Sequence, residues 1–300
     1  MTLDQLRVFV AVAEAEHMTK AAAALHLTQP AVSAAIAALE ARYGTPLFDR
    51  VGRRIELTAT GRMFLPEARA VLKRAAEAEL ALGETVGLKR GRLAIHASQT
   101  IANYWLPERL VRFRARYPEI ELAITIGNTA QVALSLREGR GDLGLIEGQI
   151  DDPALAQTRI EGDALVVVVG ATHPWARGRG RAVALEPRRL TETPWVLREP
   201  GSGTRSEFAA ALRRLGLDLE RLDIALSLPS NEAVRAAVEA GAGASAISHL
   251  VVAASLRAGT LCRIPLDLPT RPFYLVRHKA RYRSRAARAF AELIDPEPAR

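Results

Sequence analysis

The apolar pattern of this chain changes abruptly near Leu88–Gly91, and this change constrains the possible fold more than any other feature. Before it the pattern is helical almost throughout, and after it short β-rich runs alternate with helical patterns. The expected strands are Leu93–Ala97, Ile120–Ile126, Asp142–Glu147, Leu165–Gly170, Trp195–Leu197, Ile224–Leu228 and Phe273–Val276. The expected helices are Leu106–Arg116, Ala130–Arg137, Arg205–Leu215, Glu232–Ala240 and Leu250–Arg257. Because several strands are apolar on both faces and helices separate them, the pattern predicts parallel α/β sheets covered by helices.

The net charge favours a polyanionic partner but does not locate it. The chain carries a formal charge of +8, which suits nucleic acid. Within residues 1–58, however, the six Lys and Arg residues are balanced by six Asp and Glu residues. A basic run stands near the C-terminus: Arg277, Lys279, Arg281, Arg283, Arg285 and Arg288. We interpret this run as a solvated helix face, and a second phosphate-contacting patch is the weaker alternative.

Two short helices joined by a brief turn stand near the start of the chain. Thr19 is expected to cap the first of them, and Thr28 is expected to cap the next, with Pro30 in its first turn. The buried face of this next helix is expected to contain Ala31, Val32, Ile36 and Leu39. Such a pair presents its second helix to the major groove of DNA.

The exposed start of that second helix carries the candidate base-reading residues. Gln29 is the residue there that can read adenine through two hydrogen bonds, while Thr28 and Ser33 can hold phosphates or bases. Pro30 and Ala34 complete the candidate DNA surface on this helix. Arg50, Arg53 and Arg54 belong to a following basic wing suited to phosphates or the minor groove. The alternative is an all-helical dimerisation module with solvating arginines.

These residues together resemble the winged helix-turn-helix of the LysR-type transcriptional regulators. The matching segments are Lys20-Ala21-Ala22, Thr28-Gln29-Pro30-Ala31-Val32-Ser33, Leu39-Glu40, Pro46-Leu47-Phe48-Asp49-Arg50 and Leu57-Thr58. The chain departs from the commonest form at Ala34, where many members carry a long polar residue. The resemblance implies an all-α winged helix-turn-helix in residues 1–58, a linker helix in 59–90, and a two-lobed α/β effector domain of periplasmic-binding-protein type in 91–300. It also implies binding to double-stranded operator DNA as a homo-oligomer, a dimer of dimers.

The linker segment has its own helical seam. Its apolar residues alternate at spacings of four and three: Phe64, Ala68, Val71, Ala75, Ala78 and Leu82. This spacing is typical of a two-strand helical pair, and the resemblance makes it the helix that pairs two subunits. The alternative is a single helix lying on its own domain.

The resemblance divides the effector domain into a first lobe of residues 91–162 and 268–300 and a second lobe of residues 163–267. Two strands are expected to cross between the lobes near Gly162–Asp163 and near Ile264–Leu268. Loops after strands and helix N-termini line such a boundary and favour an anion. The candidate effector-binding residues are Ser98, Gln99, Thr100, Asn128, Thr129, Glu147, Gly201, Ser202, Thr204 and Asn231. Ser98, Thr100 and Asn231 are alternatively simple helix caps, and Glu147 is alternatively structural.

Three segments, among them Arg198–Arg205, look most like the branch of the family that includes the sulfur-linked regulators CysL and YeiE. Hydroxyls and helix N-termini without an obvious arginine clamp suit a small inorganic oxyanion such as sulfite or sulfate, and a small organic acid is the rival. A small-molecule binding protein that never touches DNA is the alternative from another class, and it conflicts with the N-terminal motif.

An enzyme, a cofactor and a metal are not expected. The six histidines are scattered without metal-ligand spacing. Cys262 is the single cysteine, so it forms no intrachain disulfide, and we interpret it as a small core residue. No charged leader or long apolar run is seen, so we expect a cytoplasmic protein without a membrane span.

Overall fold

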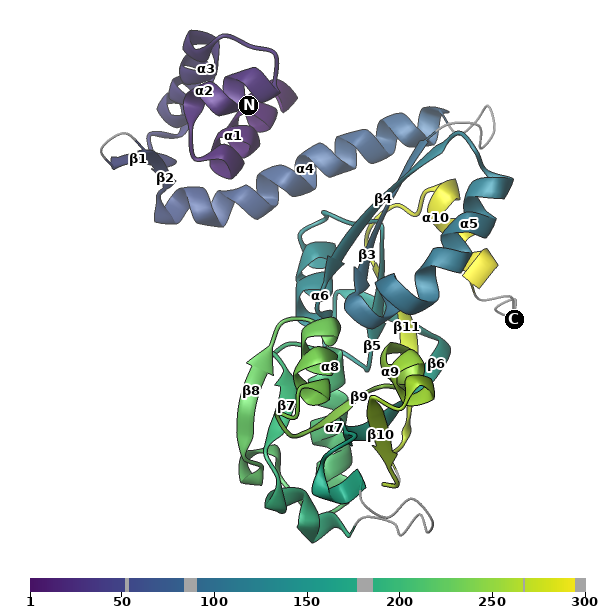
Figure 1. Ribbon diagram of the computed structural model, residues 1–300. Coiled ribbons are helices and arrows are strands. Elements are labelled where there is room, and N and C mark those ends of the chain that lie inside the picture. Colours follow the sequence, from purple (N-terminus) through teal and green to yellow (C-terminus); the bar gives the residue numbers. More distant parts are fainter. Residues whose placement is uncertain (52–53, 84–90, 177–185, 267, 295–300) are drawn as a thin grey trace. The chain divides into compact units, whose positions relative to one another are not determined.

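The computed structural model describes residues 1–51, 54–83, 91–176, 186–266 and 268–294. The chain divides into two compact units, Met1–Gly87 and Leu88–Arg300 (Figure 1). The expected end of the linker helix at residue 90 lies outside the described residues.

The first unit is built on three short helices. They are α1 (Leu3–Ala15), α2 (Met18–Ala24) and α3 (Gln29–Tyr43). Their buried residues form one core: Leu6, Val8, Phe9, Val12, Ala21, Ala22, Val32, Ile36 and Leu39. The chain bends by 107° between α2 and α3, which is the geometry of a helix-turn-helix.

The caps of these helices explain where each one starts. Thr28 Oγ1 accepts a hydrogen bond from the amide of Ala31 at 3.4 Å, so the expected cap of α3 is confirmed. The expected cap at Thr19 is wrong, because Nδ1 of His17 accepts from the amide of Thr19 and is the N-cap of α2. The backbone of Glu16 is left-handed with φ 48° and ends α1, which leaves His17 extended at the start of the next helix.

The expected buried face of α3 needs one correction. Val32, Ile36 and Leu39 are buried, but Ala31 is exposed. The core contacts of α3 begin at Val32, so the first turn of the helix remains accessible to solvent.

A two-stranded hairpin follows α3. It consists of β1 (Phe48–Val51) and β2 (Arg54–Leu57), with Phe48 paired to Leu57. The carboxylate of Glu40 on α3 accepts hydrogen bonds from the amides of Leu47 and Phe48 at 2.7 and 3.2 Å. This side chain fixes the base of the hairpin against the helix.

The long helix α4 (Ala59–Gly83) packs partly on its own unit. Ala68 is fully buried, and the ring of Phe64 lies 5.1 Å from that of Phe9 in α1. Val71 and Ala78, in contrast, are exposed. The expected seam is therefore divided, because its first residues pack on α1 within the same unit.

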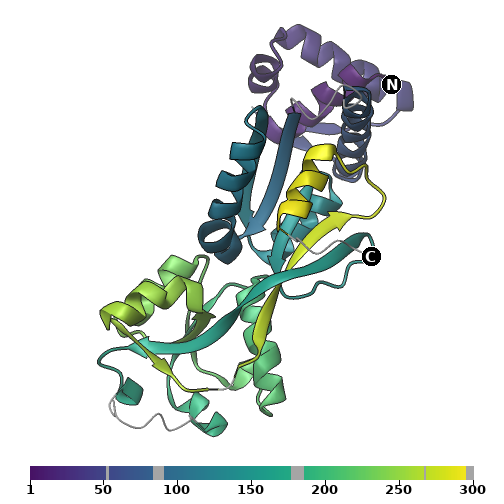
Figure 2. The ribbon, with the colours of Figure 1, turned by 90° about the vertical axis from the view of Figure 1, so that its right-hand side faces the viewer.

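The second unit has two lobes. The first contains β3 (Gly91–Ser98), η2 (Ile101–Trp105, a π-helix), α5 (Leu106–Arg116), β4 (Ile120–Gly127), α6 (Thr129–Arg137), β5 (Leu143–Glu147) and α10 (Arg285–Ile294). The second contains η3 (Pro174–Ala176), η4 (Pro187–Glu192), β7 (Trp195–Arg198), α7 (Gly203–Arg214), η5 (Leu219–Arg221), β8 (Ile224–Leu228), α8 (Asn231–Glu239), β9 (Ala244–Ser248), α9 (His249–Ala258) and β10 (Leu261–Ile264). Helices cover both faces of the strands in each lobe (Figure 2).

Two long strands pass through both lobes. They are β6 (Leu155–Gly170) and β11 (Thr270–His278), which pair antiparallel along their length (Figure 2). The strand order is β4-β3-β5-β11-β6-β9-β7-β8, with β10 on β6. The outer strands of each lobe are parallel, as the pattern predicts, but the prediction is wrong for the centre, where the crossing strands run antiparallel to their neighbours.

The first crossing is found at its expected place, but the second is not. Gly162 pairs with Pro272 and Asp163 pairs with Arg271. The second crossing therefore lies in β11, after the expected Ile264–Leu268, because Leu261–Ile264 form the separate strand β10 on β6. The sequence pattern also missed β9, whose alanine and serine residues have low strand propensity although all five are buried.

Among the described helices, no single one is long and apolar enough to cross a membrane. The helices α2 and α3 satisfy the length and composition test only as a pair, which the 107° bend interrupts.

Candidate functional site

The N-terminal turn of α3 is exposed and carries polar side chains. Thr28, Gln29, Pro30 and Ala34 are exposed, and Ser33 is half-buried. Because Thr28 is held by its cap hydrogen bond, the position of its neighbour Gln29 is set by the helix start. The candidate base-reading residues therefore lie together on one accessible helix end.

The three arginines of the expected wing are described only in part. Arg50 lies in β1 and Arg54 in β2, but the structure does not describe their side chains. Arg53 lies outside the described residues.

The two lobes of the second unit contact one another through polar side chains, and we call this the interlobe region. The side chain of Gln99 in lobe 1 donates to the carbonyl of Pro229 at 2.9 Å and accepts from the amide of Asn231 at 3.0 Å. The amide nitrogen Nδ2 of Asn231 donates to Thr100 Oγ1 at 3.1 Å. The cap interpretation of Thr100 and Asn231 is thus wrong, because Thr100 makes no side-chain cap bond and Ser230 is the N-cap of α8.

Ser98 ends β3 beside these contacts. This residue is 2% exposed, and its Oγ has no hydrogen-bond partner among the residues that the structure describes. A buried hydroxyl without a partner costs free energy, so such a group indicates a place where a ligand or water would bind.

The outer side of the interlobe region is closed by Glu232 on α8. Tyr104 Oη donates to the Glu232 carboxylate at 3.0 Å, and Asn103 Nδ2 donates to the same oxygen at 3.4 Å. Burial, followed by the hydrogen bond to Glu232, raises the pKa of Tyr104 to about 12. Both donors belong to the π-helix η2, a form that often occurs at functional sites.

The starts of α6 and α7 form the other half of the interlobe region. Asn128, the N-cap of α6, donates to Glu199 at 3.1 Å, and the amide of Ala130 donates to the carbonyl of Gly201 at 3.2 Å. An added Cβ at Gly203 would lie 2.6 Å from the carbonyl oxygen of Glu147 and from Thr129 Oγ1. Glycine is required here because the start of α7 lies against lobe 1.

Two buried arginines in or beside the interlobe region were missed by sequence analysis, which saw no arginine clamp. Nη1 of Arg198 donates to Asn231 Oδ1 at 2.6 Å, and the rest of its guanidinium binds the Glu199 carboxylate. Arg271 forms two hydrogen bonds of 2.7 Å with Asp163. Arg198 ends a buried strand in a segment that the sequence analysis quoted, but nothing in the pattern around Arg271 distinguished it from an exposed strand residue.

Arg271 connects the crossing strands to the interlobe region. Its Nη1 donates to Thr204 Oγ1 at 2.9 Å and lies 3.9 Å from the carboxylate of Glu147. Asp163 also accepts from Ser248 Oγ. Burial raises the pKa of the nearby Glu207 above its ordinary value, although Arg271 and Arg214 oppose this shift.

Glu147 is 3% exposed at the end of β5. Thr129 Oγ1 lies 3.3 Å from its carbonyl oxygen and 3.5 Å from its carboxylate. The partners of this carboxylate are thus a hydroxyl and an arginine that already binds Asp163.

Most candidate effector residues are brought together by these contacts. Gln99, Thr100, Asn128, Thr129, Gly201 and Asn231 lie at contacts between the lobes, with Glu147 and Ser98 at adjoining strand ends. Ser202 is a buried residue at the N-cap of α7 with no side-chain cap bond, and Thr204 binds Arg271. The helices α6, α7 and α8 thus all begin here, and helix N-termini favour negative charge.

The described residues contain no group of three or more His, Cys, Asp or Glu side chains placed to hold a metal ion. Cys262 is half-buried in β10 and packs against the core of lobe 2.

The first unit therefore has the bent helix pair and accessible helix end of a DNA-binding module, and the second has two lobes that meet through polar side chains. This combination defines a transcription regulator with a ligand-binding unit. Residues 3–62 match the family model of the bacterial regulatory helix-turn-helix protein, lysR family, and residues 87–298 match the LysR substrate binding domain. The chain belongs to the LysR family of DNA-binding transcriptional regulators.

Individual relatives agree with this assignment. The uncharacterized HTH-type transcriptional regulator YeiE of Escherichia coli K12 is 37% identical over 298 residues, covering 99% of this chain and 98% of its own. Among solved structures, a full-length OxyR variant from Pseudomonas aeruginosa has a TM-score of 0.74 at 23% identity, covering 98% of this chain and 94% of its own. CbnR complexed with its target DNA has a TM-score of 0.70 at 23% identity, covering 98% and 99% of the two chains. At these identities the two structures support the fold.

Proposed function

We propose that the chain reads operator DNA through the start of α3 and that a small anion bound in the interlobe region controls this activity. The exposed Gln29 supports the first part, since it follows a capped Thr28 at the end of α3 that the core leaves accessible. CbnR, a similar protein, has been solved in complex with its target DNA. The arginines Arg50, Arg53 and Arg54 of the hairpin segment complete the proposed surface with phosphate contacts.

The test of the DNA surface is Gln29→Ala, compared with wild type on matched operator and mutated operator fragments by gel shift. We expect a loss of about 1–3 kcal/mol in discrimination between bases, with the fold unchanged by circular dichroism. Lys20→Gln, on the exposed part of α2, is the control for lost charge. An unchanged base preference in Gln29→Ala would remove α3 from the reading role.

The proposed effector site rests on one observation above the others, the buried and unpartnered Ser98 Oγ beside Thr100 and Asn231. The N-termini of α6, α7 and α8 add partial positive charge around it. The full charges nearby are mostly balanced, because Arg198 binds Glu199 and Arg271 binds Asp163. A small anion held by hydroxyls and amides suits this arrangement better than a large polyanion.

Glu147 limits the kind of anion. A buried carboxylate next to a second negative charge is costly unless a hydrogen lies between the two. We therefore favour an oxyanion that carries a proton near neutral pH, such as hydrogensulfite, over sulfate, which carries none. A small organic acid with a hydroxyl group is the alternative of the same chemistry.

The remaining parts of the proposal concern assembly and location. The exposed Val71 and Ala78 of α4 support pairing of two chains through the outer half of this helix, and two such dimers would form the tetramer. Effector binding acts only if the two arrangements of the lobes bind it unequally. A cytoplasmic location follows from the proposed role on DNA.

The test of the effector site is the unfolding temperature of the full chain with sulfite, sulfate, phosphate and small carboxylates. Ligand at about 100 times its Kd stabilises by about 2.7 kcal/mol. We expect a selective shift with sulfite that Thr100→Val abolishes and that Thr158→Val, an exposed strand control, retains. Glu147→Gln should extend binding to sulfate. A shift with carboxylates alone would replace the sulfur oxyanion by an organic acid, and a normal shift in Thr100→Val would place the site elsewhere.

A further inference from the structure

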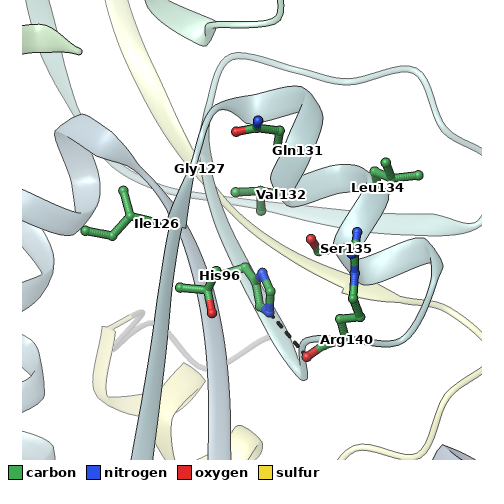
Figure 3. A pocket seen from close by; sticks show the side chains of 9 residues that line it. His96, Ile126, Gly127, Gln131, Val132, Leu134, Ser135 and Arg140 are labelled. Carbon is green, nitrogen blue, oxygen red and sulfur yellow. Dashed lines mark hydrogen bonds between the residues drawn. The ribbon is translucent and has the colours of Figure 1, made fainter. Parts of the chain in front are cut away.

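A separate pocket of about 270 Å³ lies within lobe 1, between α6 and the strands β3 and β4 (Figure 3). Its walls come from both sides of this layer and from the loop after α6: His96, Thr125, Ile126, Gly127, Gln131, Val132, Leu134, Ser135 and Arg140. None of the candidate effector residues is part of this lining. The pocket is thus a different site from the interlobe region.

One wall of the pocket is polar and fixed in place. The imidazole of His96 is 8% exposed, and its Nε2 donates to the carbonyl oxygen of Arg140 at 3.2 Å (Figure 3). An added Cβ at Gly141 would lie 2.5 Å from the His96 ring, so the loop after α6 packs directly on this side chain. These contacts hold Arg140 at the end of the pocket.

The guanidinium of Arg140 supplies the positive charge. Its Nη2 lies 2.7 Å from the carboxylate of Glu138, and its side chain is 43% exposed. A guanidinium carries five N–H donors, so this single ion pair leaves donors for a second carboxylate. The hydroxyls of Thr125 and Ser135 are further hydrogen-bonding groups in the lining.

The other wall is apolar. Val132 is buried at the base, while Ile126 is 52% exposed and Leu134 is 39% exposed. These two are large apolar side chains at the mouth of a pocket that also contains a cation. A ligand with an apolar body and a carboxylate would cover both apolar residues and pair with Arg140.

We propose that this pocket binds a small aliphatic monocarboxylate, with its carboxylate on Arg140 and its chain between Ile126, Val132 and Leu134. At about 30 Å³ for each water-sized group, the volume holds roughly nine non-hydrogen atoms. This is about the size of hexanoate or heptanoate. The pocket shares α6 with the interlobe region, because Gln131 in its wall also forms the capping box with Asn128.

The test is isothermal titration calorimetry of the full chain with butanoate, pentanoate and hexanoate. Each added methylene group should tighten binding about fourfold, since the chain is buried on apolar side chains. Arg140→Gln should weaken hexanoate binding about tenfold by removing the charged donor, while Arg137→Gln, an exposed arginine of the same helix, should not. Ile126→Thr should reduce the gain from each methylene group.

Three results would overturn the proposal. The first is hexanoate binding that Arg140→Gln leaves unchanged, and the second is an affinity that does not depend on chain length. The third is no detectable heat at millimolar ligand. Thr100→Val should bind hexanoate as the wild type does, so loss of binding in this variant would assign the carboxylate to the interlobe region instead.

Discussion

Replacing Arg271 by methionine should destabilise the second unit strongly while leaving the first unit folded. Arg271 is fully buried, forms two 2.7 Å hydrogen bonds with Asp163 and lies 3.9 Å from Glu147. Methionine fills similar space but leaves two buried carboxylates without their cation. Removing one partner of a buried ion pair costs about 3–5 kcal/mol, which corresponds to a fall of roughly 6–20 °C in Tm for a unit of this size.

Tryptophan fluorescence is the appropriate assay, because Trp105, Trp175 and Trp195, the three tryptophans of the chain, all lie in the second unit. The fluorescence transition of Arg271→Met should move to lower temperature. The double variant with Asp163→Asn should recover part of the loss, since it removes one of the stranded charges. Effects of the two substitutions that simply add would refute this reasoning, because contacting partners are expected to couple by about 0.5–3 kcal/mol.

Two further predictions concern a carboxylate and a glycine. Burial raises the pKa of Glu207 in the folded protein, so its contribution to stability is present below its unfolded pKa and is lost as pH rises through the folded one; Glu207→Gln should therefore raise Tm near pH 7 more than near pH 4, and an equal shift at both would contradict the assigned burial effect. An added Cβ at Gly61 would lie 2.2 Å from the carbonyl oxygen of Leu47, whereas Gly91 has no atom within 4 Å. Gly61→Ala should thus destabilise the first unit by about 1–3 kcal/mol in urea unfolding followed by circular dichroism, and a loss of the same size in Gly91→Ala would show that the contact is not the cause.

Sequence periodicity predicted elements well where the apolar residues define one face. The helices α5 to α9 and most strands were found within a few residues of their expected bounds. It failed where a short-range rule had two candidate residues. Thr19 has the better side chain for a cap, yet the left-handed Glu16 places His17 at the helix start.

The candidate interlobe residues were predictable by type, but their partners were not. Ser98, Thr100 and Asn128 follow buried strands, and the ends of parallel strands meet at one edge of a sheet. Arg198 is different, because a charged residue in a strand is usually exposed. Its burial depends on Asn231 and Glu199, which reach it only in the folded chain.

The sequence by itself determined the helix-turn-helix, the change to α/β structure near Gly91 and the strand-to-helix loops that carry polar residues. Each of these depends on neighbours within about one turn or one strand, so local periodicity and capping chemistry reveal them. Only the tertiary structure decided that Phe64 packs on α1, that β11 crosses beside β6, and that Arg271 lies between Asp163 and Glu147. These pairings join residues distant in the sequence, and no periodic pattern records which distant partner a buried charge or ring will meet.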